Sequence, residues 1–156
     1  MKNKVLSLIG FVFVCQLAGL IGGLITSNSV DTWYSTLIRP SLTPPNWIFG
    51  PVWTILYALL GVSSWIIFQS ESSWKKRALT AFFINILINV IWSFLFFGLQ
   101  STLLGFIWII VLELSIIWVL VEFWRVSKLA SFLMLPYFLW VSFASFVAFN
   151  IWWLNK

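Results

Sequence analysis

Residues 5–26 read VLSLIGFVFVCQLAGLIGGLIT, an apolar run without a charged side chain. A helix of this length extends roughly 33 Å at 1.5 Å per residue, which matches the hydrocarbon thickness of a bilayer. Lys2 and Lys4 precede the run, as in a secretory signal peptide. However, the run is longer than the apolar core of such a peptide and has no clear small-residue cleavage site. We therefore expect it to remain in the mature protein as a membrane-spanning helix.

The composition extends this interpretation to the whole chain. Of the 156 residues, 62% are hydrophobic and 8% are charged, whereas a soluble domain carries roughly 25% charged residues. So few charged side chains cannot cover a water-soluble domain of this size. We expect residues 1–156 to form one all-α membrane domain whose main partner is the lipid bilayer.

Four further apolar runs follow the first. Each is long enough to cross a bilayer, and each is continuously apolar rather than alternating, which favours helices over the strands of a barrel. The five expected spans are residues 5–26, 47–68, 78–97, 102–124 and 129–153. Pro51 lies in the first turns of the second span, where proline is tolerated. Pro136 lies inside the fifth span, which it should kink or loosen. The predicted fold is a bundle of five transmembrane helices.

The connections between the spans differ in length and composition. Residues 27–46 form the longest one, and Pro40, Pro44 and Pro45 restrict its backbone to a semi-extended path. We expect this segment to be an ordered cap. Residues 98–101 form a tight turn, which predicts that the third and fourth spans are antiparallel neighbours.

Basic residues gather on one side of the expected bundle. Those on the side of the amino terminus are Lys2, Lys4, Lys75, Lys76, Arg77, Arg125 and Lys128. The opposite side holds only Arg39 and Lys156. In a bacterial plasma membrane, this asymmetry predicts a cytoplasmic amino terminus and an external proline-rich cap. Because the charges stand at the ends of apolar runs, they do not indicate a nucleic-acid-binding face.

Several kinds of chemistry lack the residues they need. The chain has no histidine, which excludes His-ligated metal sites and His-based acid/base catalysis. Its one cysteine, Cys15, excludes an intrachain disulfide. Nucleotide fingerprints, P-loops, paired carboxylates and Cys-x-x-Cys are absent, so hydrolysis and phosphoryl transfer have no visible machinery. We expect no metal site and no required cofactor.

Eleven of the twelve tryptophans fall into two groups by depth. Those near span ends, as expected for side chains at headgroup depth, are Trp33, Trp47, Trp74, Trp124, Trp152 and Trp153. Those that lie deeper are Trp53, Trp92, Trp108, Trp118 and Trp140. A deep indole N–H needs a partner that lipid does not provide. We expect some of the deep set to line an interior cavity and others, especially on the fourth span, to pack between helices.

Aromatic and polar residues recur at helical spacing on three spans. The stripes are Asn85, Asn89, Trp92 and Phe96 on the third span, Trp53, Tyr57, Gly61 and Ser64 on the second, and Tyr137, Trp140, Ala144 and Ala148 on the fifth. Each stripe lies on one helix face. For the two asparagines alone, hydrogen bonding between helices and contact with a ligand are equally good interpretations. Three such stripes on three helices favour a pocket.

Glu113 stands near the middle of the fourth span, where a charge costs roughly 2.5 to 3.5 kcal/mol on insertion scales. We expect it to face the interior or to be a neutral acid bonded to a polar neighbour. A proton or cation relay is the alternative. It is the weaker one, because no second membrane-depth carboxylate or cation accompanies Glu113.

Small residues repeat along the first span. Cys15, Gly19 and Gly23 recur at intervals of four, and Gly19 to Gly23 is a GxxxG pattern, which allows helix backbones to approach closely. The contact lies either within the bundle, which we favour, or between two protomers.

Residues 33–57, WYSTLIRPSLTPPNWIFGPVWTILY, closely resemble the first loop and second helix of the TspO/MBR family. This family comprises the tryptophan-rich sensory proteins of bacteria and the mitochondrial translocator protein, once called the peripheral benzodiazepine receptor. Residues 89–98 resemble its third helix, and residues 136–144, PYFLWVSFA, resemble its fifth. The resemblance spans nearly the whole chain in the right order.

The resemblance implies a bundle that commonly forms a homodimer and holds a pocket beneath the first loop. Members bind porphyrins, benzodiazepine-type and isoquinoline ligands there, and cholesterol in animals. By position, the lining residues would be Trp53, Asn89, Trp92, Trp140 and Ala144, with Tyr34 and Pro44 closing the pocket. The stripes add Tyr57, Asn85 and Tyr137 as candidate ligand-binding residues.

The expected function is therefore receptor-like binding of porphyrins and other flat hydrophobic ligands. One alternative is light-dependent porphyrin breakdown, for which Trp53 and Trp140 would be the redox-active side chains. Another is transport of tetrapyrroles or lipids. Phe149 and Trp153 replace the tyrosine and the basic residue of the family's sterol-recognition segment, so we do not expect specific sterol recognition.

Overall fold

Five long helices, each apolar enough to cross a membrane, make up most of the computed structural model, which describes residues 2–156. The elements are α1 (Lys2–Val30), α2 (Trp33–Thr36), α3 (Asn46–Gln69), α4 (Lys75–Ser93), the π-helix η1 (Phe94–Gly98), α5 (Thr102–Val126) and α6 (Lys128–Leu154). The described residues contain no β-strand. The predicted all-α bundle of five spans is confirmed.

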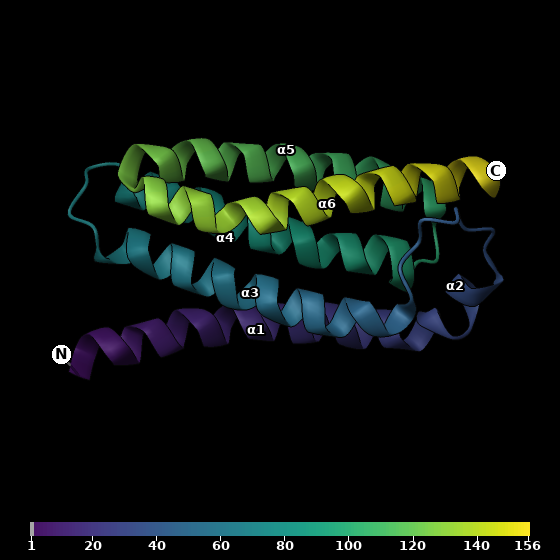
Figure 1. The fold of residues 1–156 in the computed structure, drawn as a ribbon, viewed down its shortest axis with the longest axis horizontal. Helices are drawn as coiled ribbons and strands as arrows, with labels where there is room; N and C mark the ends of the chain where they lie inside the picture. Colours follow the sequence, from purple (N-terminus) through teal and green to yellow (C-terminus); the bar gives the residue numbers. More distant parts are fainter. Residues whose placement is uncertain (1) are drawn as a thin grey trace.

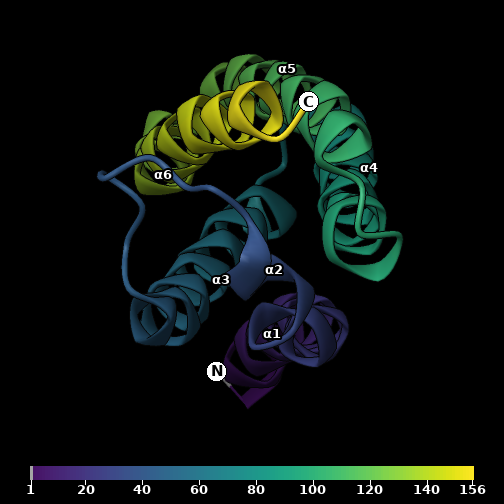
Figure 2. The same ribbon diagram turned by 90° about the vertical axis from the view of Figure 1, so that its right-hand side faces the viewer.

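The five long helices lie side by side along the long axis of the molecule (Figure 1). In the end view of Figure 2 they form a ring in the order α1, α3, α6, α5, α4. α1 packs against α3 and α4, and α6 packs against α3 and α5. α4 and α5 are direct neighbours, as the short turn between them predicts. The ring therefore makes neighbours of helices that are distant in sequence, such as α1 and α4 or α3 and α6.

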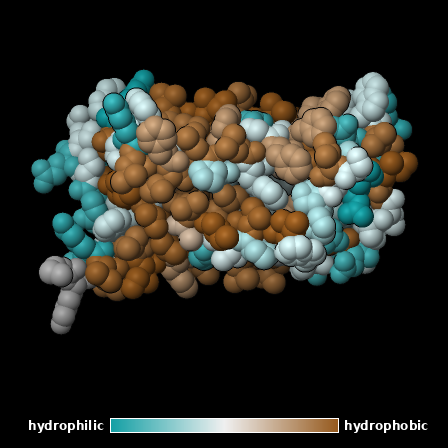
Figure 3. Space-filling view, viewed as in Figure 1, coloured by the Kyte–Doolittle hydropathy of each residue, from teal (hydrophilic) through white to brown (hydrophobic). Residues whose placement is uncertain are grey.

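The surface matches a bilayer. Figure 3 shows hydrophobic residues along the middle of the molecule and hydrophilic residues at both ends. On α1, large apolar side chains such as Leu6, Phe13 and Leu24 are about 60% or more exposed. Such exposure is costly in water but not in lipid, because acyl chains are as apolar as these side chains.

The first helix and the cap differ from the predicted boundaries. α1 continues to Val30 rather than ending at Thr26, and α2 adds a helical turn inside the expected connection. The hydroxyl of Thr26 donates to the carbonyl of Gly22 at 2.8 Å, and that of Ser27 donates to Leu24 at 3.0 Å. These bonds satisfy polar side chains within the helix. Polar composition alone therefore does not mark the end of α1.

The third span also has a different shape. α4 begins at Lys75, three residues before the predicted start, and the chain changes to π-helix at Phe94. Gln100 follows with a φ of 52°, in the left-handed region, and turns the chain toward α5. Gly105 at the start of α5 lies directly against the ring of Phe96, where a Cβ would clash. This glycine allows α5 to approach η1 closely.

Two glycines bring α1 and α3 together. A Cβ added to Gly61 would lie 2.5 Å from Cα of Val12, and one added to Gly19 would lie 2.5 Å from the ring of Tyr57. Gly23 has no such neighbour within 4 Å. For Gly19, the structure therefore shows the contact within the bundle rather than between protomers.

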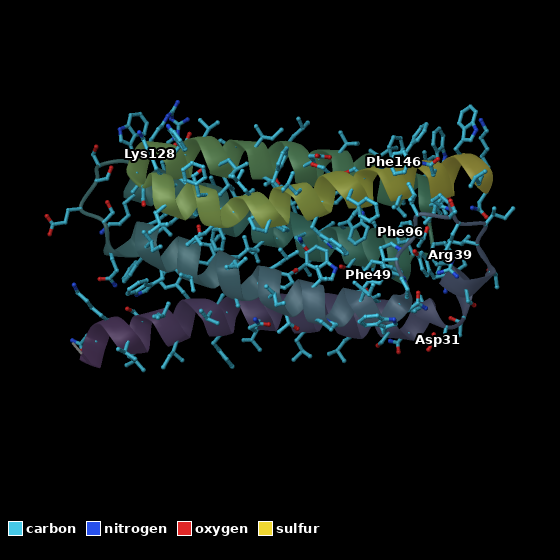
Figure 4. The ribbon with its side chains drawn as sticks, in the orientation of Figure 1. Asp31, Arg39, Phe49, Phe96, Lys128 and Phe146 are labelled. Atoms are coloured by element: carbon cyan, nitrogen blue, oxygen red, sulfur yellow. The ribbon has the colours of Figure 1, made fainter. Side chains whose placement is uncertain are left out.

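An ion-pair cluster closes the end of the bundle nearest the amino terminus. The buried carboxylate oxygen Oε1 of Glu122 lies 3.0 Å from Arg77 and 3.2 Å from Arg125. Both guanidinium groups also lie over the Trp74 ring, 5.6 and 5.1 Å from its centroid. The cluster joins the start of α4 to the end of α5. Lys128 lies at the same end of the molecule, whereas Arg39 lies at the other (Figure 4).

Candidate functional site

A cavity of about 680 Å³ lies between the helices at the end of the bundle that carries α2. This volume is within the range of about 300–1,000 Å³ found for small-molecule sites. The cavity is lined by residues of α1, α3, α4, η1 and α6, together with Tyr34 and Pro44 from the cap. Of the residues labelled in Figure 4, Phe49 of α3 packs against Trp140 of α6, and Phe96 of η1 packs against Trp92 and Tyr34. Most of the lining is apolar or aromatic.

The structure brings eight of the ten predicted site residues together around this cavity. They are Tyr34, Pro44, Trp53, Tyr57, Asn89, Trp92, Trp140 and Ala144. Part of each predicted stripe therefore faces one hollow, whereas Gly61 and Ser64 of the second-span stripe do not line it. Whether these residues bind a ligand stays a prediction.

Asn85 and Tyr137 do not line the cavity. Both are fully buried, and the amide of Asn85 donates to the hydroxyl of Ser115 at 2.8 Å, which joins α4 to α5. Asn85 therefore fits the packing interpretation. Tyr137 lies against the ring of Trp53, with 6.2 Å between ring centroids.

A chain of hydrogen bonds forms one polar part of the cavity wall. The hydroxyl of Tyr57 donates to Oδ1 of Asn89 at 2.8 Å, and Nδ2 of Asn89 donates to the hydroxyl of Tyr137 at 2.7 Å. These bonds join α3, α4 and α6. Because both ends of the Asn89 amide are engaged, its orientation is fixed before any ligand enters. Asn89 therefore links helices, as the packing interpretation predicts, and it also lines the cavity, where its contact with a ligand stays a prediction.

The indoles that line the cavity come from three different helices. Trp92 donates its N–H to the carbonyl of Gly105 at 3.0 Å, and its ring is stacked on Phe96 with an interplanar angle of 11°. Trp53 lies beside Tyr57, with ring centroids 5.5 Å apart. The buried N–H of Trp140 has no hydrogen-bond partner in the described chain.

The deep tryptophans of α5 do not line the cavity, and of the two only Trp108 packs between helices as expected. Trp108 donates to the carbonyl of Ile88 at 3.0 Å, and so packs α5 against α4. Trp118 is 37% exposed on the outer face. A position far from the ends of a span therefore does not by itself identify a tryptophan that lines the cavity.

The cap forms a roof over the cavity. Tyr34 of α2 is buried, and its ring packs against Phe96 and Phe97 at centroid distances of 6.1 and 5.6 Å. The guanidinium of Arg39 lies 5.0 Å from the Tyr34 ring centroid. Burial raises the pKa of the Tyr34 hydroxyl, and the neighbouring Arg39 partly opposes that rise. The tyrosine is therefore neutral at physiological pH.

Parts of the cavity wall on α1 and α3 are exposed. The amide of Gln16 donates to the carbonyl of Thr54 at 2.9 Å and joins the two helices. The lining residues Leu20, Gly23 and Gly50 are exposed, so the cavity is not fully enclosed.

Several lining residues were missed by sequence reasoning. They include Gln16, Gly22 and Gly23 of α1, Phe49 of α3, and Phe143, Val147 and Ile151 of α6. Continuing the α6 stripe from Trp140 by seven and eleven positions finds Val147 and Ile151. No comparable signal marks Gly22 and Gly23, because glycine patterns on a span indicate close helix contacts as readily as a cavity.

Glu113 lies outside the cavity, between α5 and α6. Its two carboxyl oxygens accept hydrogen bonds from the hydroxyl of Ser142 and, at 2.8 Å, from that of Ser145. The expectation that polar neighbours bind this carboxyl is confirmed. Residues 2–156 hold no cluster of three or more His, Cys, Asp or Glu that could bind a metal ion.

Comparisons with known proteins agree with this architecture. Residues 11–154 match the model of the TspO/MBR family. The chain is 40% identical to tryptophan-rich protein TspO of Archaeoglobus fulgidus, with 97% of this chain and 99% of that protein covered. It is 38% identical to tryptophan-rich protein TspO of Chlorobaculum tepidum, with 99% of each chain covered. It is 25% identical to the translocator protein of Homo sapiens, with 92% of this chain and 86% of that protein covered.

The family match covers almost the entire chain, and the archaeal and bacterial relatives align with it from end to end. Together with the five membrane-spanning helices, this shows that the chain is an integral membrane protein and belongs to the TspO/MBR family.

Proposed function

We propose that this protein is a membrane receptor for porphyrins and other flat hydrophobic ligands, such as isoquinoline- or benzodiazepine-type compounds, which bind in the cavity beneath the roof. The observation that carries the proposal is the convergence of four indoles, two from α3 and one each from α4 and α6, on one hollow of about 680 Å³. Aromatic side chains gain about 0.5–1.5 kcal/mol per ring pair beyond area burial. A large π-system fits such walls better than a compact polar molecule does.

The polar groups around the cavity are few, which favours the same class of ligand. The Asn89 amide is held by two tyrosines, so a ligand meets a rigid wall rather than a mobile amide. The N–H of Trp140 has no partner within the described bundle, and a small rotation of this ring would let it donate to a ligand nitrogen or carbonyl. A preorganised site loses little entropy on binding.

Protoporphyrin IX titration into the protein in lipid nanodiscs, followed by quenching of tryptophan fluorescence, tests the proposal. Trp140→Leu should weaken binding about 2- to 10-fold, since one ring contact is lost. Trp118→Leu is the matched control, because Trp118 lies on the lipid-facing surface outside the cavity. Equal affinities for the wild type and both variants would show that porphyrin binds elsewhere, and no saturable quenching at all would refute the proposed function.

We further propose that the protein lies in a bacterial plasma membrane with its amino terminus in the cytoplasm. Basic residues such as Arg77, Arg125 and Lys128 lie at the same end of the bundle as the amino terminus. By the positive-inside rule, this end faces the cytoplasm. The roof would then face the periplasm. Labelling of a cysteine introduced at Ser41 by an impermeant maleimide in intact cells tests this, and failure of labelling until the cells are opened would contradict it.

A further inference from the structure

The roof segment, residues 37–45, has little backbone structure of its own. Its hydrogen bonds within the cap are local turns, such as Thr43 N–H to the carbonyl of Pro40 at 3.0 Å and Leu37 N–H to that of Tyr34 at 3.4 Å. Pro40, Pro44 and Pro45 have no N–H to donate. Leu37 packs against the buried cluster that includes Ile151, and Arg39 lies over the Tyr34 ring. The local turns themselves give the segment no hydrogen-bonded connection to a distant helix.

Asn155, at the end of α6, makes that connection. Its Oδ1 accepts a hydrogen bond from Ile38 N–H at 3.0 Å, and its Nδ2 donates to the Ile38 carbonyl at 2.9 Å. Nδ2 also donates to the carbonyl of Ile151 at 2.7 Å, which orients the amide on the helix end. Within residues 2–156, the two bonds to Asn155 are the only hydrogen bonds we find between the roof segment and a distant part of the chain.

The contact is made to the backbone and not to the Ile38 side chain, which is 61% exposed. It resembles the paired bonds of neighbouring strands, because one amide engages the N–H and the carbonyl of the same residue. A carboxamide carries an acceptor and a donor side by side on one planar group, and glutamine would displace that group by one methylene. Ile151, one turn before Asn155, lines the cavity. The contact therefore ties the roof to a helix that forms the cavity wall.

We propose that Asn155 is a latch: a positioning residue that holds the roof segment closed over the cavity and controls how often the cavity opens toward water. The latch is a property of the fold and can be tested without a ligand. Its effect on ligand exchange rests on the proposed function. Breaking two hydrogen bonds of ordinary net strength should raise the open population of the roof about 5- to 30-fold.

Hydrogen exchange measured by mass spectrometry on the whole protein in nanodiscs tests the latch directly. In Asn155→Ala, a peptide covering residues 37–43 should exchange about 5- to 30-fold faster, while peptides from α3 and α5 stay unchanged. Asn155→Asp keeps the acceptor for Ile38 N–H but loses the donor, so it should give an intermediate rate. Asn150→Ala is the matched control, since Asn150 bonds only to the carbonyl of Phe146 on its own helix.

Stopped-flow binding of protoporphyrin IX tests the consequence for ligand exchange. If the roof is the gate, association and dissociation should both be about 5- to 30-fold faster in Asn155→Ala, with a nearly unchanged Kd. Unchanged exchange of residues 37–43 in Asn155→Ala would overturn the latch. Faster hydrogen exchange with unchanged ligand rates would overturn the gating role, because the ligand then leaves by a route other than the roof.

These failures differ from failure of the proposed function. If the wild type shows no saturable porphyrin binding, the receptor proposal falls, while the hydrogen-exchange result still decides whether Asn155 holds the roof. If Asn155→Ala does not fold, the intermediate rate predicted for Asn155→Asp decides the question, and a rate equal to that of the wild type would count against the latch.

Discussion

Replacing Gly61 by alanine is expected to push α1 away from α3. The new Cβ would lie 2.5 Å from Cα of Val12 and 2.9 Å from its backbone nitrogen. Carbon atoms in ordinary contact are about 3.5–4.0 Å apart, so the two helices must separate by about 1 Å. Because the nearest atoms belong to the α1 backbone, no side-chain rotation can relieve the clash.

The cost follows from this displacement. Overpacking of a well-packed interior typically costs about 1–3 kcal/mol. Alanine also favours the helix over glycine by about 0.5–1 kcal/mol, which partly offsets the clash. A matched variant removes that second effect: Gly10→Ala makes the same chemical change on α1, where nothing lies within 4 Å of the new Cβ. We therefore expect Gly61→Ala to be about 1–3 kcal/mol less stable than Gly10→Ala.

Reversible unfolding of both variants in the same mixed micelles measures this difference. The free energy of unfolding of the wild type should lie between those of the two variants. Stabilities of the two alanine variants within about 0.5 kcal/mol of each other would refute the reasoning, because the close approach of α1 to α3 at Val12 would then carry no energetic weight.

For three other changes, the structure predicts whether the measured quantity falls or stays the same. Asn89→Leu removes the hydrogen bonds to Tyr57 and Tyr137. At about 0.6–1.7 kcal/mol per interhelical bond, this variant should lower the free energy of unfolding by about 1–3 kcal/mol. Tyr57→Phe removes only one of these bonds and should lower the free energy of unfolding about half as much in the same assay. Glu113→Gln should leave porphyrin affinity within about twofold, because the side chain lies outside the cavity; a titration that showed lost affinity would restore the relay interpretation. The raised pKa of Tyr34 means that its neutral form is favoured in the closed roof. Its contribution to the stability of the closed roof should therefore be complete below a pH of about 10 and lost as the pH rises through the raised pKa. Hydrogen exchange of the roof should show this loss in the wild type and not in Tyr34→Phe.

The number and type of spans could be predicted from the sequence because hydropathy acts on whole segments. A run of 20 or so apolar residues has few alternatives to a helix in lipid. The end of α1 could not be placed in the same way. Ser27 and Thr26 bond to carbonyls of their own helix, so these polar residues extend α1 instead of ending it.

The cavity residues could be predicted where a stripe contained large side chains on a helix that faces the ring interior. Periodicity identifies a face, however, and gives no depth along that face. Asn85 and Asn89 lie on one stripe, yet Asn89 lines the cavity whereas Asn85 is hydrogen-bonded to Ser115 of α5. Glycines of α1 and the contact of Asn155 with Ile38 depend on tertiary geometry that no local pattern encodes.

Because the cavity of this membrane-spanning bundle is not fully enclosed, the bilayer is both a reservoir and a competitor for the site. A flat apolar compound dissolves in the acyl chains, so its concentration beside Leu20 and Gly23 is set by partitioning rather than by the amount free in water. Acyl chains can also occupy the mouth of the cavity and must leave when the compound enters. A dissociation constant expressed per volume of buffer should therefore change with the amount of lipid in the assay, whereas one expressed as a mole fraction in the bilayer should not.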